Sequence, residues 1–417
     1  MERAEINLSD REFWGLPIAE REEAFRLLRA DDELGFFPEP EGALDPGPGY
    51  YALTRHADVV AASRQPQLFC SGKGTDIVDM PPWMLDFFGS MINMDDPRHA
   101  RLRRIVSRAF TPKVLAGMQA DVDEIAAGIV AEVAPRGECD FVTEVAARLP
   151  LRVIVDLMGI PRSQEQFIFD RTNVILGFSD TEYVPEQDIG SILTALIGAG
   201  NDLANLVREL ADERIADPGD DLLSALVTAE VEGDHLTAEE MASFFILLVV
   251  AGNETTRNAI AHGLHALTEH PDQRARWQAD FEGLAPTAVE ELVRWATPVI
   301  HFRRTVTTDG ARIGEHELRE GDKVVLFYGS ANRDEAQFAD PFNFDVGRTP
   351  NDHVGFGGPG PHYCLGAHLA RREITVAFRE LFRRVPDIHS VGDPDRLRSG
   401  FINGIKHLHA EFTPTAA

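Results

Sequence analysis

The stretch Gly355-Phe-Gly-Gly-Pro-Gly-Pro-His-Tyr-Cys-Leu-Gly366 carries the strongest signal in this chain of 417 residues. It is a loop rich in glycine and proline, and it delivers a cysteine to the start of a helix predicted over Ala367–Arg384. Glycines allow a backbone to approach another atom closely and to adopt positive φ. The unpaired N–H groups and the positive dipole end of the helix should stabilise a thiolate at Cys364. The loop therefore predicts a metal-binding sulfur.

Several kinds of site could use such a loop. A phosphate-binding glycine loop contains no prolines, so Pro359 and Pro361 argue against it. A zinc site made of His362, Cys364 and His368 would have an uncommon spacing, and no second cysteine pair is present. A structural turn with an incidental cysteine stays open. The interpretation that we favour is an axial haem ligand, because a thiolate in that position promotes O–O cleavage.

A second motif interrupts a hydrophobic helix predicted over Thr237–Glu269. Residues 243–251, Ser-Phe-Phe-Ile-Leu-Leu-Val-Val-Ala, are apolar on every face, so this helix must be buried. The polar run Gly252-Asn-Glu-Thr-Thr256 follows directly. Burying an acid and two hydroxyls is unfavourable unless they have partners or line a wet cavity. We expect an oxygen-binding site, in which Thr255 donates a hydrogen bond to dioxygen and Glu254 relays protons. The alternative is a solvated turn on a surface helix.

Both motifs resemble those of the cytochrome P450 family. The loop is similar to the haem signature Phe-Gly-x-Gly-x-His-x-Cys-x-Gly, although Phe356 lies eight residues before the cysteine where the family has seven. The polar run is similar to Ala-Gly-x-Asp/Glu-Thr. The resemblance extends from about Tyr50 to the C-terminus. It implies one domain over residues 1–417, mainly α with a small β lobe, that holds haem b (Fe-protoporphyrin IX) between the long central helix and the cysteine loop.

The resemblance also implies roles for individual residues. Cys364 corresponds to the ligand of the haem iron. The residues that correspond to haem contacts are His99, Arg103, Ala251, Arg303, Phe356, Gly358, His362, Cys364 and Gly366. Glu291 and Arg294 match the structural Glu-x-x-Arg pair of the family, and three-residue spacing places them on one helix face. A third partner, often an arginine in a later segment, is replaced here by Asn343.

The segments that face the substrate in this family are rich in apolar residues, which implies a sizeable apolar ligand. The predicted substrate contacts are Ile77, Met84, Phe87, Phe88, Met94, Leu176, Phe178, Leu247, Val250, Ala251, Val299, Phe401 and Ile402. Ordinary core packing is the alternative for each of them. The strings at Ser243–Asn258, Phe281–Glu290 and Phe401–Lys406 are similar to actinobacterial hydroxylases of methyl-branched lipids and cholesterol side chains. This similarity implies terminal hydroxylation of a branched lipid, isoprenoid or sterol chain.

Two alternatives in function stay open. One is a tailoring P450 of secondary metabolism, which hydroxylates or couples aromatic rings with the same iron chemistry and a different pocket. The other is a non-catalytic haem-binding or lipid-binding protein. The Glu254–Thr255 pair argues against the second alternative, because a sensor does not need a buried proton relay.

Composition limits the partners and the compartment. The formal net charge of −28 disfavours nucleic acid. Three cysteines far apart form no disulfide framework, which agrees with the cytoplasm. The acidic start Met1–Glu5 is unlike a signal peptide, and no apolar run reaches the length of a membrane anchor. We expect a monomer that uses O₂ and an apolar small-molecule substrate.

Electrons must come from other proteins, because no flavin or nicotinamide domain fits in the chain. The resemblance implies a ferredoxin, and a ferredoxin reductase that takes electrons from NAD(P)H. The run from Arg98 to Lys113 has basic residues and no acidic neighbour, so it is suited to dock an acidic partner. The docking residues expected in it are Arg101, Arg104, Arg108 and Lys113.

Local patterns also predict the framework. Helices are expected over residues 98–109, 113–134, 187–216, 237–269, 287–296 and 367–384. Strands are expected over residues 50–54, 303–308, 323–328 and 406–412. Strands at both ends of a helical body indicate an α-rich fold with a small sheet.

Overall fold

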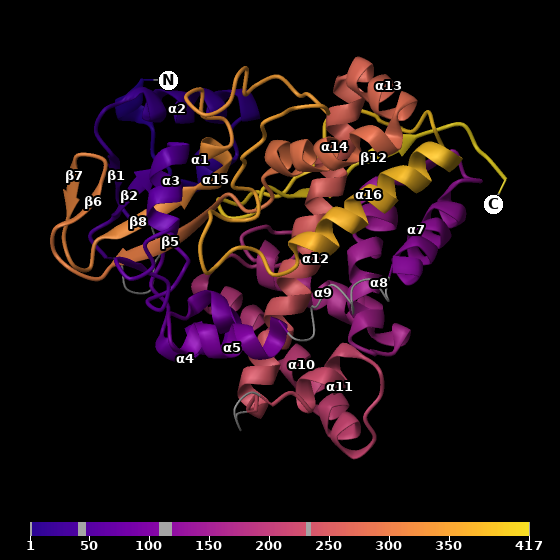
Figure 1. The fold of residues 1–417 in the computed structure, drawn as a ribbon, viewed down its shortest axis with the longest axis horizontal. Helices are drawn as coiled ribbons and strands as arrows, with labels where there is room; N and C mark the ends of the chain where they lie inside the picture. The colour runs from indigo at the N-terminus through magenta and orange to yellow at the C-terminus, as the bar shows by residue number, and fades with distance from the viewer. Residues whose placement is uncertain (1, 41–46, 108–118, 231–234, 417) are drawn as a thin grey trace.

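A computed structural model describes residues 2–40, 47–107, 119–230 and 235–416, so Arg108 and Lys113 lie outside the described residues. Helices make up most of the molecule, and a small lobe of sheet lies on one side of it (Figure 1). The predicted fold class, mainly helical with a small β lobe, is confirmed. Among the described residues, no helix has both the length and the apolar character that crossing a bilayer requires.

The larger helices follow the predicted pattern. Their bounds are α2 (Ile18–Ala30), α3 (His56–Ser63), α4 (Pro82–Gly89), α5 (Arg98–Ser107), α7 (Gln119–Val133), α8 (Arg148–Leu157), α9 (Glu165–Gly177), α10 (Ile189–Ala216), α11 (Leu222–Val227), α12 (Ala238–Glu269), α13 (Pro271–Ala279), α14 (Phe281–Ala296) and α16 (Ala367–Arg384). Shorter turns are α1 (Arg11–Trp14), α15 (Tyr328–Ala331), the 3₁₀ turns η1 (Arg3–Glu5), η2 (Ser90–Asn93) and η4 (Arg162–Gln164), and the π turn η3 (Val142–Ala146).

The main sheet has the strand order β1-β2-β8-β5-β3. Its strands are β1 (Gly35–Phe37), β2 (Tyr50–Leu53), β3 (Phe69–Cys70), β5 (His301–Val306) and β8 (Lys323–Phe327). β2 and β8 run parallel, and the other neighbours are antiparallel. The remaining strands form small sheets: β4 (Glu138–Asp140), β6 (Ala311–Ile313), β7 (His316–Leu318), β9 (His389–Ser390), β10 (Asp395–Arg396), β11 (Ile405–His407) and β12 (His409–Glu411).

Two predicted elements differ from the structure. The helix expected from Thr287 begins six residues earlier as α14, because the Asp280 side chain accepts a hydrogen bond from the backbone N–H of Gly283 and caps the first turn. Pro286 is accommodated inside the helix. The C-terminal strand is divided into β11 and β12, since β11 pairs with β10 whereas β12 pairs with β4 and β9.

Helix α12 passes through the centre of the molecule (Figure 1). A capping box starts it: Thr237 Oγ1 accepts from the N–H of Glu240, and the Glu240 carboxylate accepts from the N–H of Thr237. Its first half packs with α8 and α10, and its second half packs with α14 and α16. A run of helix enclosed by packed neighbours has no solvent-facing side, which explains why residues 243–251 are apolar on every face.

A buried charge network joins α14 to the segment before the cysteine loop. Glu291 is fully buried, and Arg294 donates to its two carboxylate oxygens at 2.7 and 2.8 Å. Arg348 supplies the third member, with Nε 3.2 Å from Glu291 Oε2. The side chain of Asn343 is not needed for this purpose, because its backbone carbonyl accepts from Arg348 Nη2 at 2.7 Å.

We expect Glu291→Gln to lower the free energy of unfolding by about 3–5 kcal/mol, because the two buried arginines lose their anion. Urea denaturation followed by circular dichroism measures this loss. Glu317→Gln is the matched control: its partner Arg312 is 57% exposed and the pair contributes about 0–1 kcal/mol. Equal effects of the two substitutions would contradict a structural role for the network.

Candidate active site

A cavity of about 260 Å³ lies between α12, the loop 355–366 and strand β5. From α12 it is lined by Leu247, Ala251, Gly252 and Thr255, and from the loop by Phe356, Gly358, His362, Cys364 and Gly366. Arg103 from α5 and Val299 also line it. The two motifs that the sequence singles out, far apart in the chain, thus meet at one cavity.

The loop reaches the cavity because its glycines allow close packing. Gly357 has φ +86°, a conformation that side chains disfavour. A Cβ on Gly358 would lie 2.3 Å from Ser63 Oγ at the end of α3. The N–H of Cys364 donates to the carbonyl of Phe356 at 3.0 Å, which closes the loop and presents the sulfur to the cavity.

The sulfur of Cys364 lies in conflicting surroundings. Burial raises the pKa of the Cys364 thiol above its ordinary value. The N–H of Gly366 and the positive charges of Arg103 and Arg371 act in the opposite direction, as expected at a helix N-terminus, but they do not outweigh burial. A metal cation at this sulfur would supply the missing stabilisation of the thiolate.

Phe356, one residue further from the cysteine than the family pattern has it, is held by an ion-pair cluster. The Arg371 guanidinium lies 4.4 Å from the centre of its ring. Arg371 pairs with Glu290, which also lies 3.0 Å from His353 Nε2. Burial alone would raise the pKa of Glu290, yet the hydrogen bonds from Arg371 and His353 lower it to about 2. The cluster fixes the loop to α14 and α16 despite its extra residue.

Basic groups without a carboxylate partner in the described part of the chain line another part of the cavity. Arg304 is buried and donates through Nη1 to the carbonyl of Arg303 at 2.7 Å, and burial lowers its pKa. His362 Nε2 lies 3.1 Å from Ser71 Oγ, and burial together with Arg304 lowers its pKa to about 3. Arg103 Nη2 donates to the carbonyl of Tyr363 at 2.6 Å.

His99 belongs to this basic set but lies behind His362, further from the cavity. It does not line the cavity, but its ring lies 4.3 Å from that of His362, and its buried Nε2 has no hydrogen-bond partner among the described residues. Buried cations and donors of this kind require anionic acceptors. The residues present therefore fit haem, which carries two carboxylates beside a ring that needs an axial ligand.

The prediction for Arg303 is corrected by the structure. Adjacent residues of a strand point to opposite faces, so only one of Arg303 and Arg304 can face the cavity. Arg304 does so, whereas Arg303 is fully buried on the other face, with Nη1 2.6 Å from Asp79 Oδ1 and further bonds to the carbonyls of residues 73, 74 and 77. Its role is to hold the turn 73–79.

The acid and the alcohol on α12 point in different directions. Thr255 lines the cavity and donates to the carbonyl of Ala251 at 2.7 Å. Glu254 does not line the cavity: it is buried, ion-paired with Arg257, and accepts from Asn258 Nδ2 at 2.9 Å. Arg257 is anchored in turn to Asn173 of α9 at 2.9 Å. The prediction that Glu254 relays protons directly at the cavity therefore requires Arg257 to move away first.

The structure adds an acid that sequence reasoning missed. Glu373 of α16 lines the cavity and is buried, and burial raises its pKa to about 8 despite a hydrogen bond with Thr256. It therefore carries a proton near neutral pH. The available signal was its position: Glu373 occupies the apolar stripe of α16 between Ala370 and Ala377.

Three of the predicted substrate contacts, Leu247, Ala251 and Val299, line the cavity. The others do not, because most pack into the core: Ile77, Met84, Met94, Val250 and Ile402 are buried, Phe87 and Phe88 pack on Gly200 of α10, and Leu176, Phe178 and Phe401 lie outside the lining. The lining instead gains apolar residues that the sequence did not single out, namely Met91, Ile92, Ile154, Phe244, Leu248 and Phe302.

Comparisons with known proteins agree with this geometry. The cytochrome P450 family model matches residues 160–397. A methyl-branched lipid omega-hydroxylase of Mycobacterium tuberculosis is 51% identical over 409 residues, covering 97% of this chain and 94% of the relative. A steroid C26-monooxygenase of Rhodococcus jostii is 41% identical over 396 residues, covering 93% and 81%.

Solved structures give the same result. A cytochrome P450 of Mycobacterium marinum, solved in complex with pseudoionone, superposes with a TM-score of 0.93 and 43% identity, covering 98% of each chain. P450 enzymes use a haem-thiolate cofactor, O₂ and redox partners. The match over more than half of the chain, and relatives of this similarity, lead to one conclusion: the chain is a monooxygenase that belongs to the cytochrome P450 family.

Proposed function

We propose that this enzyme hydroxylates the terminal methyl-branched end of a long apolar lipid, with Cys364 as the ligand of the haem iron. The observation that carries the proposal is a single cavity in which the thiol of Cys364, the hydroxyl of Thr255 and an apolar wall meet. When bound, a haem-thiolate supplies the O₂-activating chemistry that no side chain provides.

Four residues are suited to hold the haem. Arg103 and Arg304 offer guanidinium donors to its carboxylates, and His362 and His99 offer ring nitrogens beside them. Ala251 has only a methyl side chain and Gly358 has none, so the cavity wall at both positions can lie close to a flat ring. Arg303 is excluded from this set by its bonds to the turn 73–79.

Proton supply rests on α12 and α16. The Thr255 hydroxyl faces the cavity and can donate to bound oxygen once it leaves the Ala251 carbonyl. The protonated Glu373 and the Thr256 hydroxyl lie on the same cavity and can hold a proton nearby. Glu254, paired with Arg257 and Asn258, stabilises the polar stretch of α12 and is a proton source only after release from that pair.

The apolar wall of the cavity selects among substrates by the apolar area that each one buries against it. Phe244, Leu247, Leu248, Val299 and Phe302 contribute to it. Each buried methylene or methyl group contributes about 0.8 kcal/mol. The omega-hydroxylase relative acts on methyl-branched lipids, and the steroid C26-monooxygenase relatives act on steroids. A sterol side chain is therefore the second candidate substrate.

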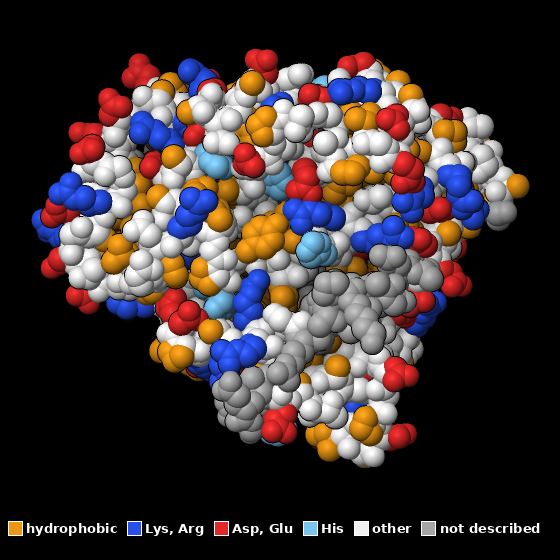
Figure 2. All heavy atoms as spheres, viewed as in Figure 1, with side chains coloured by type: hydrophobic (Ala, Val, Ile, Leu, Met, Phe, Trp, Pro, Cys, Tyr) orange, Lys and Arg blue, Asp and Glu red, His pale blue; other side chains and the backbone are white. Residues whose placement is uncertain are grey.

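Electrons are proposed to come from a ferredoxin that is reduced by a ferredoxin reductase with NAD(P)H. Lys and Arg side chains gather over α5 and the first turns of α16, on the face shown in Figure 2. Arg101 already forms an ion pair within the protein, since its Nη1 lies 2.9 Å from Glu240 Oε1. Arg104 is exposed on the same helix. This face suits an acidic partner on an otherwise acidic protein.

Replacing Cys364 by serine should abolish the thiolate signature of the reduced, carbon-monoxide-bound absorption spectrum, because serine does not supply the sulfur ligand. Cys139→Ser is the control: Cys139 is buried in the cluster around α7 and α8, whereas Cys364 is exposed to the cavity. A thiolate spectrum that survives in Cys364→Ser, or is lost in Cys139→Ser, would refute the assignment of the ligand.

Thr255→Ala should lower the amount of product formed per NAD(P)H consumed by about tenfold or more, since loss of a positioned proton donor costs about 10²–10⁴ in rate. Thr255→Ser should restore most of the coupling. Thr268→Ala is the control, because Thr268 makes the same kind of bond, to the Leu264 carbonyl at 2.9 Å, away from the cavity. Unchanged coupling in Thr255→Ala would exclude Thr255 from proton supply.

The substrate proposal is tested by absorption titration of the haem-loaded enzyme with phytanic acid and with palmitic acid, which has the same main-chain length without the methyl branches. Phytanic acid should bind at least tenfold more tightly, because its branches add buried area. The product should carry the new hydroxyl at the branched end. Absence of a spectral shift with phytanic acid, farnesol and cholestenone would overturn the substrate class.

A further inference from the structure

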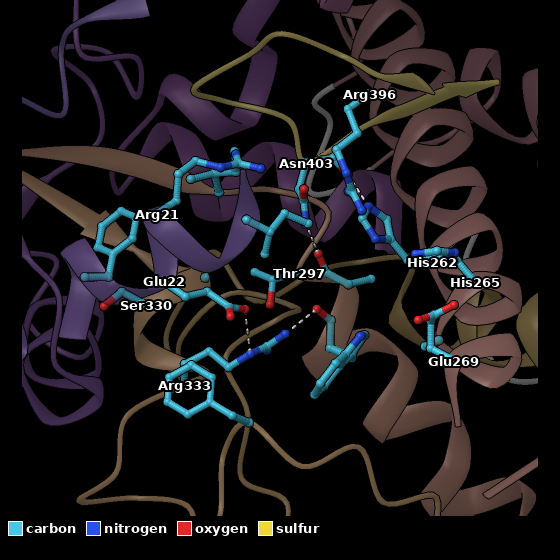
Figure 3. Close-up of a pocket in the computed structure, with 18 of the residues that line it drawn as sticks. Arg21, Glu22, His262, His265, Glu269, Thr297, Ser330, Arg333, Arg396 and Asn403 are labelled. Carbon is cyan, nitrogen blue, oxygen red and sulfur yellow. Dashed lines mark hydrogen bonds and ion pairs between the residues drawn. The ribbon is translucent and has the colours of Figure 1, made fainter. Parts of the chain in front are cut away.

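A second cavity, of about 290 Å³, lies between α2, the C-terminal half of α12, the end of α14 and the segment 396–403 (Figure 3). It has no lining residue in common with the haem cavity. Its apolar lining includes the aromatic rings of Trp14, Phe25 and Trp295. The monooxygenase reaction described above uses none of these residues.

Three arginines, Arg21, Arg333 and Arg396, come to this cavity from different parts of the chain (Figure 3). Each keeps a buried nitrogen without a hydrogen-bond acceptor among the described residues: Nε of Arg21, Nε of Arg333 and Nη1 of Arg396. Arg333 is 8% exposed, and its terminal nitrogens are anchored to the carbonyls of Arg294 and Trp295 at 3.2 and 3.0 Å. A buried N–H without an acceptor is unfavourable, so these three donors are suited to bind a ligand that supplies hydrogen-bond acceptors.

The acids that line the cavity leave these donors without a hydrogen bond. Glu22 lies 3.6 Å from Arg333 Nε, beyond hydrogen-bond distance, and Glu269 is exposed at the other end, beside His265. Arg29 is already paired with Glu335.

Charged neighbours act on the pKa of these arginines in both directions. Burial, followed by the positive charge of Arg21, lowers the pKa of Arg396 to about 10. Burial, followed by Arg294, lowers the pKa of Arg333 to about 10. Burial lowers the pKa of His262 to about 3, so this ring is neutral. Asp393 and Glu22 act in the opposite direction on Arg396, as Glu22 and Glu291 do on Arg333, so burial outweighs the acids that face these two arginines.

We propose that this cavity binds a small organic carboxylate. Its carboxylate accepts from Arg21 and Arg396, with Arg333 behind, because guanidinium groups bind carboxylates through paired donors. Its apolar or aromatic body packs on Trp14, Phe25 and Trp295. A volume of about 290 Å³ is near the lower end of ligand pockets, which suits a molecule the size of benzoate.

The occupant is placed to influence the haem cavity, because the two cavities share a wall. Thr297 and Ile300 face the arginine cavity, whereas Pro298 and Val299 between them face the haem cavity. Ile300 N donates to the Phe401 carbonyl at 2.8 Å. We therefore expect the carboxylate to change substrate affinity, a part of the inference that rests on the proposed function.

Asn403 fixes the same wall to α12 and α14. Its N–H donates to the carbonyl of Pro298 at 2.9 Å, and its Nδ2 donates to the carbonyl of Ala296 at 2.6 Å. Its own carbonyl lies 2.9 Å from His262 Nε2 in the arginine cavity. A ligand bound in this cavity thus contacts groups that are hydrogen-bonded to the wall of the haem cavity.

Isothermal titration of the haem-loaded enzyme with benzoate tests the site, with benzyl alcohol as the uncharged probe and inorganic phosphate as the charge-only probe. We expect saturable binding of benzoate, and binding of the other two at least tenfold weaker. Arg21→Gln and Arg396→Gln should each weaken benzoate binding at least tenfold. Arg398→Gln is the matched control, since Arg398 is exposed and paired with Glu12.

Nε of the Arg21 side chain is buried without a hydrogen-bond partner among the described residues, so the Arg21 variant keeps the test valid even if Arg396→Gln does not fold. No saturable benzoate binding, equal binding of phosphate, or binding that is unchanged in Arg21→Gln would overturn the site. A benzoate-induced change in haem absorption that persists in Arg21→Gln would assign the binding to the haem cavity and overturn it as well.

Coupling is measured by repeating the lipid titration with saturating benzoate. We expect the lipid dissociation constant to shift at least threefold in the wild type and not in Arg21→Gln, with a reciprocal shift for benzoate. Benzoate binding without a shift would overturn the coupling and leave the site supported. Benzoate binding in an enzyme that binds none of the lipids would place the failure in the proposed function.

Discussion

The site depends on holding a sulfur atom in a cavity where the surrounding protein disfavours its anion. Burial raises the pKa of the Cys364 thiol, and the nearby N–H of Gly366 and the positive charge of Arg103 only partly oppose this effect. If Cys364 is the iron ligand, as proposed, a bound metal cation would complete the site, since a metal cation deprotonates a coordinating thiol. The protein's contribution is geometric. Its glycine loop brings the sulfur to the cavity, and the Glu290–Arg371 pair keeps the loop in place.

The same rule separates structural charges from functional ones. Buried charges that hold the framework are paired: Glu291 with Arg294 and Arg348, and Glu254 with Arg257. Around the haem cavity, Arg304 lacks a carboxylate within hydrogen-bond distance among the described residues, and the buried Nε2 of His99 lacks a hydrogen-bond partner there. A buried cation without an anion is unfavourable in a stable fold unless a ligand supplies the anion. Unpaired buried charge is thus a physical criterion for a ligand, independent of any family resemblance.

The sequence could predict chemistry that is local in the chain. The cysteine loop and the polar run on α12 are continuous stretches, so the helices that carry them followed from periodicity. The meeting of Cys364 with Thr255 followed from the resemblance of both motifs to those of the cytochrome P450 family. It could not predict side-chain direction where neighbours compete. Arg303 and Arg304 alternate across one strand, and only the packed turn 73–79 decides which faces the cavity. Arg348, the partner of Glu291, likewise depends on contacts between distant segments. The predictions of apolar substrate contacts were wrong most often, because core positions and pocket positions have the same kinds of apolar residues.

The position of α12 explains how one helix serves two cavities. Its middle, at Ala251 and Thr255, faces the haem cavity, and its later turns, at His262 and Ala266, face the arginine cavity. An apolar wall gives little discrimination between lipids of similar area, since selection by one methyl group is worth about 1–3 kcal/mol. The position of hydroxylation must then be set by the point at which the apolar wall of the haem cavity blocks the end of the lipid chain. At Val299 that wall is held by backbone hydrogen bonds of its neighbours rather than by side-chain bulk. The position of the chain end therefore depends on the groups behind the wall as much as on those that touch the substrate.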